Sequence, residues 1–285
     1  MYIQWFPGHM TKALRLIEEN ITNIDVVGYV LDARAPFACF NPAFDKILKD
    51  LPCVFVLNKC DLADDTVTAK WISYFKSIGM DAITVSIDKH SSVNLIKSSF
   101  AAAPKKSIER LKARGVYRAT RAMIVGVPNC GKSTIINTLS GKKSTLVGDK
   151  PGVTKGKQWI RLDEGLELLD TPGTLWSKFE DQNIAQNLLF IGSISDAVVD
   201  IIEGAQLLLA KLIALYPHLL AKRFKLELEA LKNSPAWLLE EIAKKRGCLI
   251  KGQPDLTRAA FLTLDEFKKG KIGKITLEIP ADYGK

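Results

Sequence analysis

The chain has 285 residues, of which 47% are hydrophobic, 25% charged and 8% aromatic. This is the composition of an ordinary globular protein, so intrinsic disorder and fibrous structure are excluded. Lys and Arg total 40 against 31 Asp and Glu, and the net charge of +9 favours an anionic partner such as nucleic acid or a membrane surface. The five cysteines are widely spaced without a C-x-x-C pair. A disulfide framework and a zinc site are therefore not predicted, and we expect a cytoplasmic location.

Short apolar runs rich in β-branched residues predict the strands of a buried sheet. In chain order they are 26–31, 53–57, 82–87, 122–127 and 166–169, and a sixth strand is predicted at 157–162, just before the last of them. Helical patterns alternate with these runs, which is typical of a parallel, doubly wound α/β sheet. Only residues 163–165 separate the last two runs, so we expect an antiparallel hairpin at one edge.

The strand pattern ends near Phe179, and apolar residues then recur at helical spacing. Amphipathic helices are predicted at 205–215, 217–231, 235–246 and 255–261, followed by a polar tail beyond Lys268. The sequence therefore predicts two domains: an α/β domain of residues 1–180 and a smaller all-α domain of residues 181–285.

Residues 126–133 read GVPNCGKS, which matches the phosphate-binding pattern G-x-x-x-x-G-K-[ST] and follows a predicted strand. In such a loop, backbone N–H groups and a helix N-terminus surround the phosphates. Lys132 would neutralise the β and γ oxygens, and Ser133 would bind Mg²⁺. The residues that we expect to bind the nucleotide here are Asn129, Cys130, Gly131, Lys132, Ser133 and Thr134.

The sequence D-T-P-G at 170–173 follows another predicted strand. Its Asp170 can hold Mg²⁺, and the amide of Gly173 can sense a γ-phosphate. Alone, this tetrapeptide is more typical of a turn with a capping Asp. Combined with the phosphate-binding loop, it predicts a nucleotide-sensitive switch.

The sequence N-K-C-D at 58–61 likewise follows a strand. The Asp61 carboxylate can accept hydrogen bonds from the N1–H and exocyclic amine of guanine, a pair of donors that adenine lacks. Lys59 can lay its aliphatic stem along the base. A polar strand-to-helix turn explains this motif equally well when it stands alone, but all three motifs together predict that Asn58, Lys59 and Asp61 bind GTP.

The order of these motifs differs from that of an ordinary small GTPase, in which the phosphate loop comes first and N-K-x-D follows. Rotating the sequence, with the cut after residue 86, restores every element. Circular permutation preserves a fold when the original termini lie close together on the surface. We therefore predict a circularly permuted P-loop GTPase with a mostly parallel six-stranded sheet.

The motifs together resemble the circularly permuted ribosome-assembly GTPases of the YlqF/RbgA family. Six segments carry the resemblance: WFPGHM at 5–10, DARAP at 32–36, NKCD at 58–61, GVPNCGKS at 126–133, PGVT at 151–154 and DTPG at 170–173. The resemblance implies hydrolysis of GTP to GDP and phosphate during late assembly of the large (50S) ribosomal subunit, with turnover stimulated by the particle. Alternatives are a nucleotide-gated RNA- or protein-binding switch with vestigial hydrolysis, and a tRNA- or signalling-linked GTPase.

The resemblance also implies roles for single residues. Thr154 corresponds to a switch threonine that reaches Mg²⁺, and Ser86 to the residue whose backbone supports the guanine carbonyl. Thr174 stands where Ras-like enzymes keep a water-orienting glutamine, a function that the family assigns to a histidine that maps onto His9. Asn129 resembles an asparagine that holds K⁺ against the phosphates. The implied catalytic residues are His9, Lys132 and Thr154, and the implied Mg²⁺ ligands are Ser133, Thr154 and Asp170.

Two of these assignments have plainer alternatives, namely a capping or packing role for His9 and simple turn chemistry for Thr154. Positive charge is concentrated between Lys105 and Arg161, where fourteen basic residues against two acidic ones give +12. A charge run is ordinarily a solvated linker, but this excess suits RNA phosphates. A second basic tract at 222–274 would extend that surface. The expected partners are a large-subunit precursor and its rRNA, with no membrane, and we expect a monomer away from the ribosome.

Overall fold

The computed structural model describes residues 2–5, 7–86, 90–141, 158–163 and 165–282. Six strands form one sheet in the order β3-β2-β1-β4-β6-β5. They are β1 (Val26–Asp32), β2 (Cys53–Asn58), β3 (Asp81–Val85), β4 (Thr120–Gly126), β5 (Gln158–Asp163) and β6 (Leu166–Asp170). Every neighbouring pair is parallel except β5 and β6, which are antiparallel. The predicted α/β class and the edge hairpin are therefore confirmed.

Helices cover the sheet and continue beyond it. They are α1 (His9–Asn20), α2 (Ala43–Ile47), α3 (Asp65–Ser77), α4 (His90–Ala102), α5 (Lys105–Ala113), α6 (Lys132–Ser140), α7 (Gln182–Phe190), α8 (Ile201–Leu215), α9 (Pro217–Phe224), α10 (Pro235–Lys245) and α11 (Leu256–Lys268). A short hairpin of β7 (Leu249–Ile250) and β8 (Gln253–Pro254) separates the last two helices. Within the described part of the chain, every helix is too short or too polar to span a bilayer.

The central strand β1 is buried at all seven positions, as expected for a strand covered on both faces. On one face, a Cβ added to Gly28 would lie 2.4 Å from the Phe100 ring of α4, so only glycine allows this close packing. Elsewhere in the core, Phe55 of β2 stacks on Phe75 of α3 with ring centroids 5.0 Å apart. These contacts hold the strands so that their carboxyl ends form one edge.

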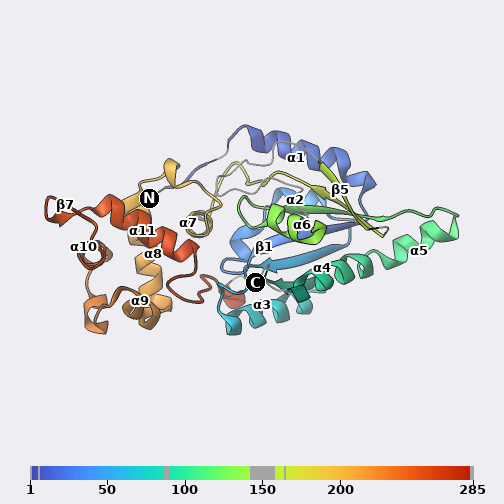
Figure 1. Ribbon diagram of the computed structural model, residues 1–285. Coiled ribbons are helices and arrows are strands. Elements are labelled where there is room, and N and C mark those ends of the chain that lie inside the picture. The colour runs from blue at the N-terminus through green and yellow to red at the C-terminus, as the bar shows by residue number, and fades with distance from the viewer. Residues whose placement is uncertain (1, 6, 87–89, 142–157, 164, 283–285) are drawn as a thin grey trace.

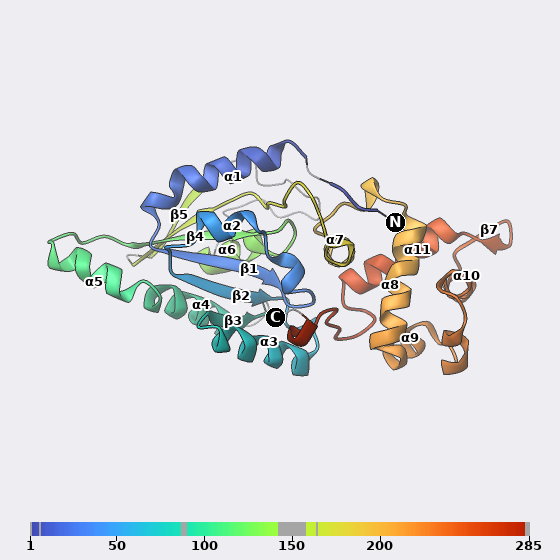
Figure 2. The same cartoon turned by 180° about the vertical axis from the view of Figure 1, so that it is seen from behind.

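The helical region lies beyond those carboxyl ends. Helices α8 to α11 gather at one end of the sheet, α5 projects from the opposite end, and α7 lies between the sheet and the helical group (Figures 1 and 2). The phosphate loop, D-T-P-G and N-K-C-D each follow a parallel strand, so these three motifs lie at the end of the sheet that faces the helical region.

Two predicted helices have different ends in the structure. The helix predicted at 217–231 ends at Phe224, because Lys225 adopts a left-handed conformation with φ of 55°, and a separate 3-10 turn, Leu228–Lys232, follows. The helix predicted at 255–261 continues to Lys268, shortly before Gly270 with φ of 69°. A glycine shortly after the last turn is the ordinary signal for such an end.

The polar tail predicted beyond Lys268 is instead a buried segment that returns to the sheet. Ile275 N–H donates to the carbonyl of Leu62 at 3.0 Å, and Leu277 N–H donates to the carbonyl of Arg34 at 2.7 Å. Both apolar side chains are buried. The prediction of a polar tail was therefore wrong, because the tail packs beside the base-recognition motif. The division into residues 1–180 and 181–285 stays a prediction.

Candidate functional site

The phosphate-binding loop joins β4 to α6 and depends on backbone conformations that favour glycine. Gly126 and Gly131 have φ values of 150° and 98°. A Cβ on Gly126 would lie 2.4 Å from the carbonyl oxygen of Val30, so no other residue fits there. The loop leads into the N-terminus of α6, whose first amides have no partners within the helix and suit an anion.

Lys132 is folded back on this loop. Its side chain is 6% exposed, and Nζ donates to the carbonyls of Gly126 at 3.1 Å and Val127 at 2.8 Å. A buried ammonium group requires such acceptors. Phosphate oxygens would form stronger, charge-assisted hydrogen bonds with the same group.

The D-T-P-G segment packs directly on the phosphate loop. A Cβ on Gly173 would lie 2.6 Å from Pro128 Cα and 3.0 Å from Lys132 Nζ, which leaves room only for glycine. Next to it, Thr174 N–H donates to the carbonyl of Gly126 at 3.2 Å. The structure thus brings these two motifs together.

Asp170 has an unusual environment. Its carboxylate is fully buried, and neither oxygen has a hydrogen-bond partner. Burial raises the pKa of Asp170 to about 6, although the positive charge of Lys132 acts to lower it. A buried carboxylate without a donor is unfavourable, and a hard cation supplies the missing partner.

These residues therefore fit Mg²⁺. Oxygen ligands are what Mg²⁺ prefers, and it is usually bound by one or two protein groups together with phosphates and water. Among the described residues, no group of three or more His, Cys, Asp or Glu could hold a metal ion. Two of the three predicted ligands are among the described residues: Asp170 is the last residue of β6, and Ser133 lies in the first turn of α6. Thr154, the third predicted ligand, lies outside the described residues.

The base-recognition motif is bonded to the same loop. Asn58 Nδ2 donates to the carbonyl of Cys130 at 2.8 Å, and Lys59 Nζ donates to the carbonyl of Asn129 at 2.8 Å. Asp61 is exposed, so its carboxylate is accessible to a ligand. The three described motifs, which are far apart in the sequence, therefore surround one site.

Two other predicted residues have contacts of their own. Ser86 N–H donates to Ser92 Oγ at 3.3 Å, and that hydroxyl donates to the Ser86 carbonyl at 2.8 Å, so the Ser86 backbone is bonded to α4. Its role toward guanine stays a prediction. Burial raises the pKa of the Cys130 thiol, which therefore remains protonated.

The N-terminal segment lies against the chain that follows D-T-P-G. Ile3 N–H donates to Gln182 Oε1 at 2.7 Å, and Gln4 Nε2 donates to the carbonyl of Ser177 at 2.8 Å. His9 is the first residue of α1, and the sulfur of its neighbour Met10 accepts from Leu175 N–H at 3.4 Å. The start of α1 is thereby held beside the switch segment.

The phosphate loop is also bonded to the turn after α7, a contact that the sequence does not predict. Asn129 Nδ2 donates to the carbonyl of Gly192 at 2.7 Å, and Ser193 Oγ donates to the carbonyl of Pro128 at 2.7 Å. The side chain predicted to hold K⁺ thus contacts the segment that leads into the helical region.

Sequence reasoning assigned no role to Asp32 and Arg34, which lie in the DARAP segment. Asp32 ends β1 and pairs in register with Asn58, at the end of β2. A residue at the carboxyl end of a parallel strand next to the base motif is a candidate for a ligand site, and this position is the signal that could have identified Asp32.

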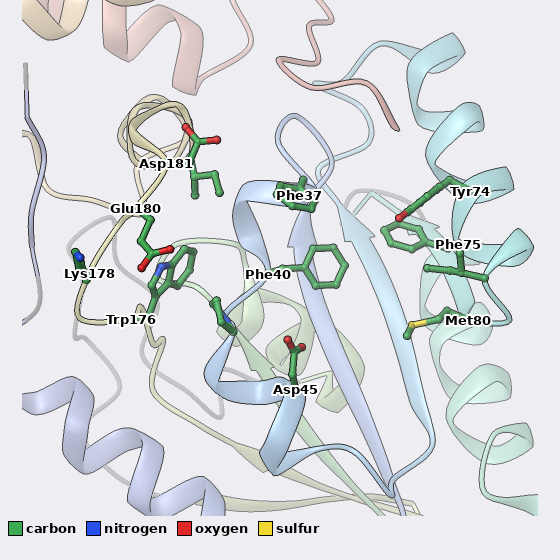
Figure 3. Close-up of a pocket in the computed structure, with 13 residues that line it drawn as sticks. Phe37, Phe40, Asp45, Tyr74, Phe75, Met80, Trp176, Lys178, Glu180 and Asp181 are labelled. Atoms are coloured by element: carbon green, nitrogen blue, oxygen red, sulfur yellow. The ribbon is translucent and has the colours of Figure 1, made fainter. Parts of the chain in front are cut away.

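A cavity of about 670 Å³ lies beside the switch segment. Figure 3 shows aromatic side chains along it, with Trp176 on the side of the switch segment and Tyr74 and Phe75 on α3 across from it. None of the predicted site residues lines it. It is therefore separate from the nucleotide motifs.

Comparison with known proteins identifies the family. Residues 121–233 match the family described as 50S ribosome-binding GTPase. A Ribosome biogenesis GTPase A from Bacillus cereus is 41% identical, covering 100% of this chain and 96% of its own length. The relative of that name from Thermotoga maritima is 37% identical, covering 98% and 95%. A crystal structure of GNP-bound YlqF from T. maritima matches with a TM-score of 0.67 at 32% identity, over 94% of this chain and 98% of that one.

The chain belongs to the ribosome biogenesis GTPase A family. It is accordingly a GTPase that binds guanine nucleotides, and the predicted family, fold and enzyme class are confirmed. The family match from residue 121 begins in β4, so the N-K-C-D motif at 58–61 precedes it. This is the order that circular permutation requires.

Proposed function

We propose that this GTPase acts in late assembly of the large (50S) ribosomal subunit and that the ribosomal particle stimulates its turnover. The observation that carries the proposal is the meeting of buried Asp170, Lys132 and Gly173 at the phosphate loop, directly beside the segment that leads into the helical region. The names of its relatives, Ribosome biogenesis GTPase A, support the ribosomal part of the proposal.

Lys132 and the switch residues would stabilise the phosphates during hydrolysis. Lys132 Nζ would exchange its carbonyl acceptors for β and γ oxygens, and Ser133, Thr154 and Asp170 would hold Mg²⁺. Bound Mg²⁺ neutralises charge on the phosphoryl oxygens. The amide of Gly173 reports whether a γ-phosphate is present, because this glycine is packed against the loop.

The attacking water needs an orienting group other than the side chain at position 174. Thr174 is fully buried, and its hydroxyl oxygen accepts from Asn41 Nδ2 at 3.3 Å, so it is not directed to solvent. We assign this role to His9. The bonds that hold residues 3 and 4 on the switch segment support the assignment, because they fix the N-terminal segment that carries the histidine.

Asn129 is proposed to bind K⁺ when nucleotide is present, so that the ion adds positive charge next to the phosphates. Its side chain would then exchange the Gly192 carbonyl for the ion. Hydrolysis should be faster in K⁺ than in Na⁺, and equal rates in the two salts would contradict this assignment.

We assign the main rRNA contact to α5 and the loop after it. This helix has no buried residue, and Tyr117 beyond it is 79% exposed, which suits stacking on a base. The exposed cations there are Lys105, Lys106, Arg110, Lys112 and Arg114. Arg118 and Arg121 contribute less, because they pair with Asp25 and Glu167.

The second basic tract offers less free charge than its composition indicates. Many of its cations bond to acids of this chain: Arg223 and Arg246 to Glu266, Lys244 to Glu241, Lys268 to Asp196, Lys269 to Asp265 and Lys274 to Asp65. That the second tract extends the RNA surface stays a prediction, and we expect its contribution to be smaller than that of α5.

We further propose that residues 1–180 act as the GTPase domain and residues 181–285 as a helical domain that the nucleotide orients. Movement of the D-T-P-G segment would reach α7 directly along the chain.

Hydrolysis measured with and without purified large subunits tests the proposed function. Wild type should be stimulated by the particles, and His9→Ala should lose most of the stimulation while binding GDP normally. Lys12→Ala, an exposed change on the same helix, is the matched control. A wild-type rate that is unchanged by large subunits would contradict the proposal.

A further inference from the structure

Asp32, Arg34 and Lys59 form a group of charges at the carboxyl ends of β1 and β2, called the Asp32 cluster below, in which Lys59 is partly exposed. One Asp32 oxygen lies 2.9 Å from Lys59 Nζ and 2.8 Å from Arg34 Nη2, and the other accepts from Arg34 Nε at 2.9 Å. Asp32 is 0% exposed and Arg34 is 1% exposed. Burial acts to raise the pKa of Asp32, but the charges of Arg34 and Lys59 outweigh it and hold that pKa well below its ordinary value. The carboxylate is therefore ionised.

Arg34 connects this cluster to the helical region. Its Nη1 donates to the carbonyls of Phe267 at 3.1 Å and Lys268 at 3.0 Å, in the last turn of α11. The carboxyl end of a helix carries a partial negative charge that favours a cation. The guanidinium also lies over the Phe267 ring, 5.3 Å from its centroid.

The charge balance makes the α11 contact part of the cluster. Arg34 and Lys59 share the one carboxylate of Asp32, and a fully buried guanidinium such as that of Arg34 is unfavourable unless further acceptors satisfy it. The carbonyls at the end of α11 are the acceptors that offset it. Arg34 thus needs one partner in the sheet and one in the helical region.

Lys59 connects the same carboxylate to the nucleotide site, because its Nζ also donates to the Asn129 carbonyl of the phosphate loop. One cavity of about 530 Å³ is lined by Lys59 and Arg34 on the side of the sheet and by Lys268 and Lys269 at the carboxyl end of α11. The base motif and the end of α11 therefore border the same space.

We propose that Asp32 and Arg34 are positioning residues: they hold Lys59 for guanine binding and transmit the occupancy of the guanine site to the carboxyl end of α11. This inference rests on the assignment of Lys59 to guanine in the proposed site. Because the cluster adjoins the base motif rather than the D-T-P-G segment, GDP and a GTP analogue have the same effect on α11. Through this route, the helical region therefore responds to whether the guanine site is occupied and not to which nucleotide occupies it.

Binding of a fluorescent GDP derivative to the full chain tests the positioning role. Asp32→Asn leaves the buried Arg34 and the partly exposed Lys59 without their carboxylate and weakens binding at least about tenfold. Arg34→Met weakens it less, and Arg34→Lys, which keeps the charge, restores part of the loss. The matched control is Glu266→Gln in α11. It removes the charge partner of Arg223 and Arg246, away from the Asp32 cluster, and leaves GDP affinity unchanged. Unchanged affinity in Asp32→Asn and Arg34→Met would overturn the positioning role.

Amide hydrogen exchange of residues 265–271 tests the transmission. The amides of Lys269, Gly270 and Lys271 close the end of α11 by donating to carbonyls of its last turn. In wild type they exchange more slowly with saturating GDP or GTP analogue than without nucleotide, and in Arg34→Met this nucleotide-dependent difference disappears. The same difference in Arg34→Met, or none in wild type, would overturn the inference.

Lys59→Met separates this inference from the site assignment on which it rests. If Lys59→Met binds GDP as tightly as wild type, the assignment of Lys59 to guanine is wrong and the inference falls with it. If Lys59→Met binds weakly while Arg34→Met keeps the wild-type exchange pattern, the assignment stands and only the transmission fails.

Discussion

The two ends of the sheet hold their positive charge in different ways. At the carboxyl end, Arg34 and Lys132 are buried and donate to acceptors within the chain. At the opposite end, the cations of α5 are exposed on a helix with no buried residue (Figure 1). Buried cations require acceptors of fixed geometry, as a nucleotide provides, whereas exposed cations suit the repeating charge of a nucleic-acid backbone. The difference fits the proposal that the carboxyl end binds GTP and that α5 binds rRNA.

The comparison is tested most strongly by removing one lysine from each end. Lys132→Ala should lower GTP hydrolysis by about a thousandfold, because the buried ammonium group faces the developing charge on the phosphates. Lys112→Ala on α5 should leave intrinsic hydrolysis unchanged. Phosphate release without ribosomal particles measures both. A similar loss in the two variants would remove the distinction between the ends.

The second largest effect is expected at Asp170. Its pKa is raised from 3.8 to about 6, so its contribution to the stability of metal-free protein is fully present below pH 3.8 and is lost as the pH rises through 6. That shift corresponds to about 3 kcal/mol. Asp170→Asn should therefore raise the free energy of unfolding of metal-free protein at pH 7.5.

Denaturant unfolding with and without Mg²⁺ and GDP measures this effect. Mg²⁺ should stabilise wild type bound to GDP and should add little to Asp170→Asn. The metal assignment would be contradicted if Mg²⁺ stabilised both proteins equally.

Glu278 gives a smaller, pH-dependent effect at the same end. Its carboxylate accepts from the amides of Phe37 and Ala38 and from Asn187 Nδ2. Burial raises its pKa from 4.5 to about 7, although these hydrogen bonds act to lower it. Its contribution to stability is therefore lost as the pH rises through 7, by about 1.4 kcal/mol between pH 6 and 8. Urea unfolding of Glu278→Gln should lack this change, while Glu109→Gln on exposed α5 should retain it.

The smallest effect is expected on RNA binding at α5. The double variant Arg110→Ala/Lys112→Ala should bind rRNA about fivefold more weakly at low salt and lower the salt slope by about two. Lys244→Ala/Lys269→Ala removes two cations that already pair with acids of the chain. Its slope should match wild type, and an equal loss in both double variants would show that pairing does not decide which cations bind RNA.

The sequence predicted the elements whose signal is local. The predicted ranges located all six strands to within about two residues, and the signal was clearest for β1, which is buried on both faces and shows as a continuous apolar segment. The phosphate loop and base motif were found for the same reason. The residues of each motif are close together along the chain, so each motif can be recognised before the fold is known.

Contacts between distant segments were not predictable in this way. A polar tail was predicted beyond Lys268, yet Ile275, Thr276, Leu277 and Glu278 are all buried. Likewise, Arg34 and the end of α11 are more than 230 residues apart, and no local pattern pairs them. Such partners emerge only from the packing of the helical region on the sheet.

Co-sedimentation with large-subunit precursors tests the central claim most directly. The full chain, bound either to a GTP analogue or to GDP, is centrifuged with purified particles, and the fraction in the pellet is measured. The account predicts that the GTP-analogue form sediments with the particles and that most of the GDP form remains in the supernatant. Equal sedimentation of the two forms, or none of either, would contradict it.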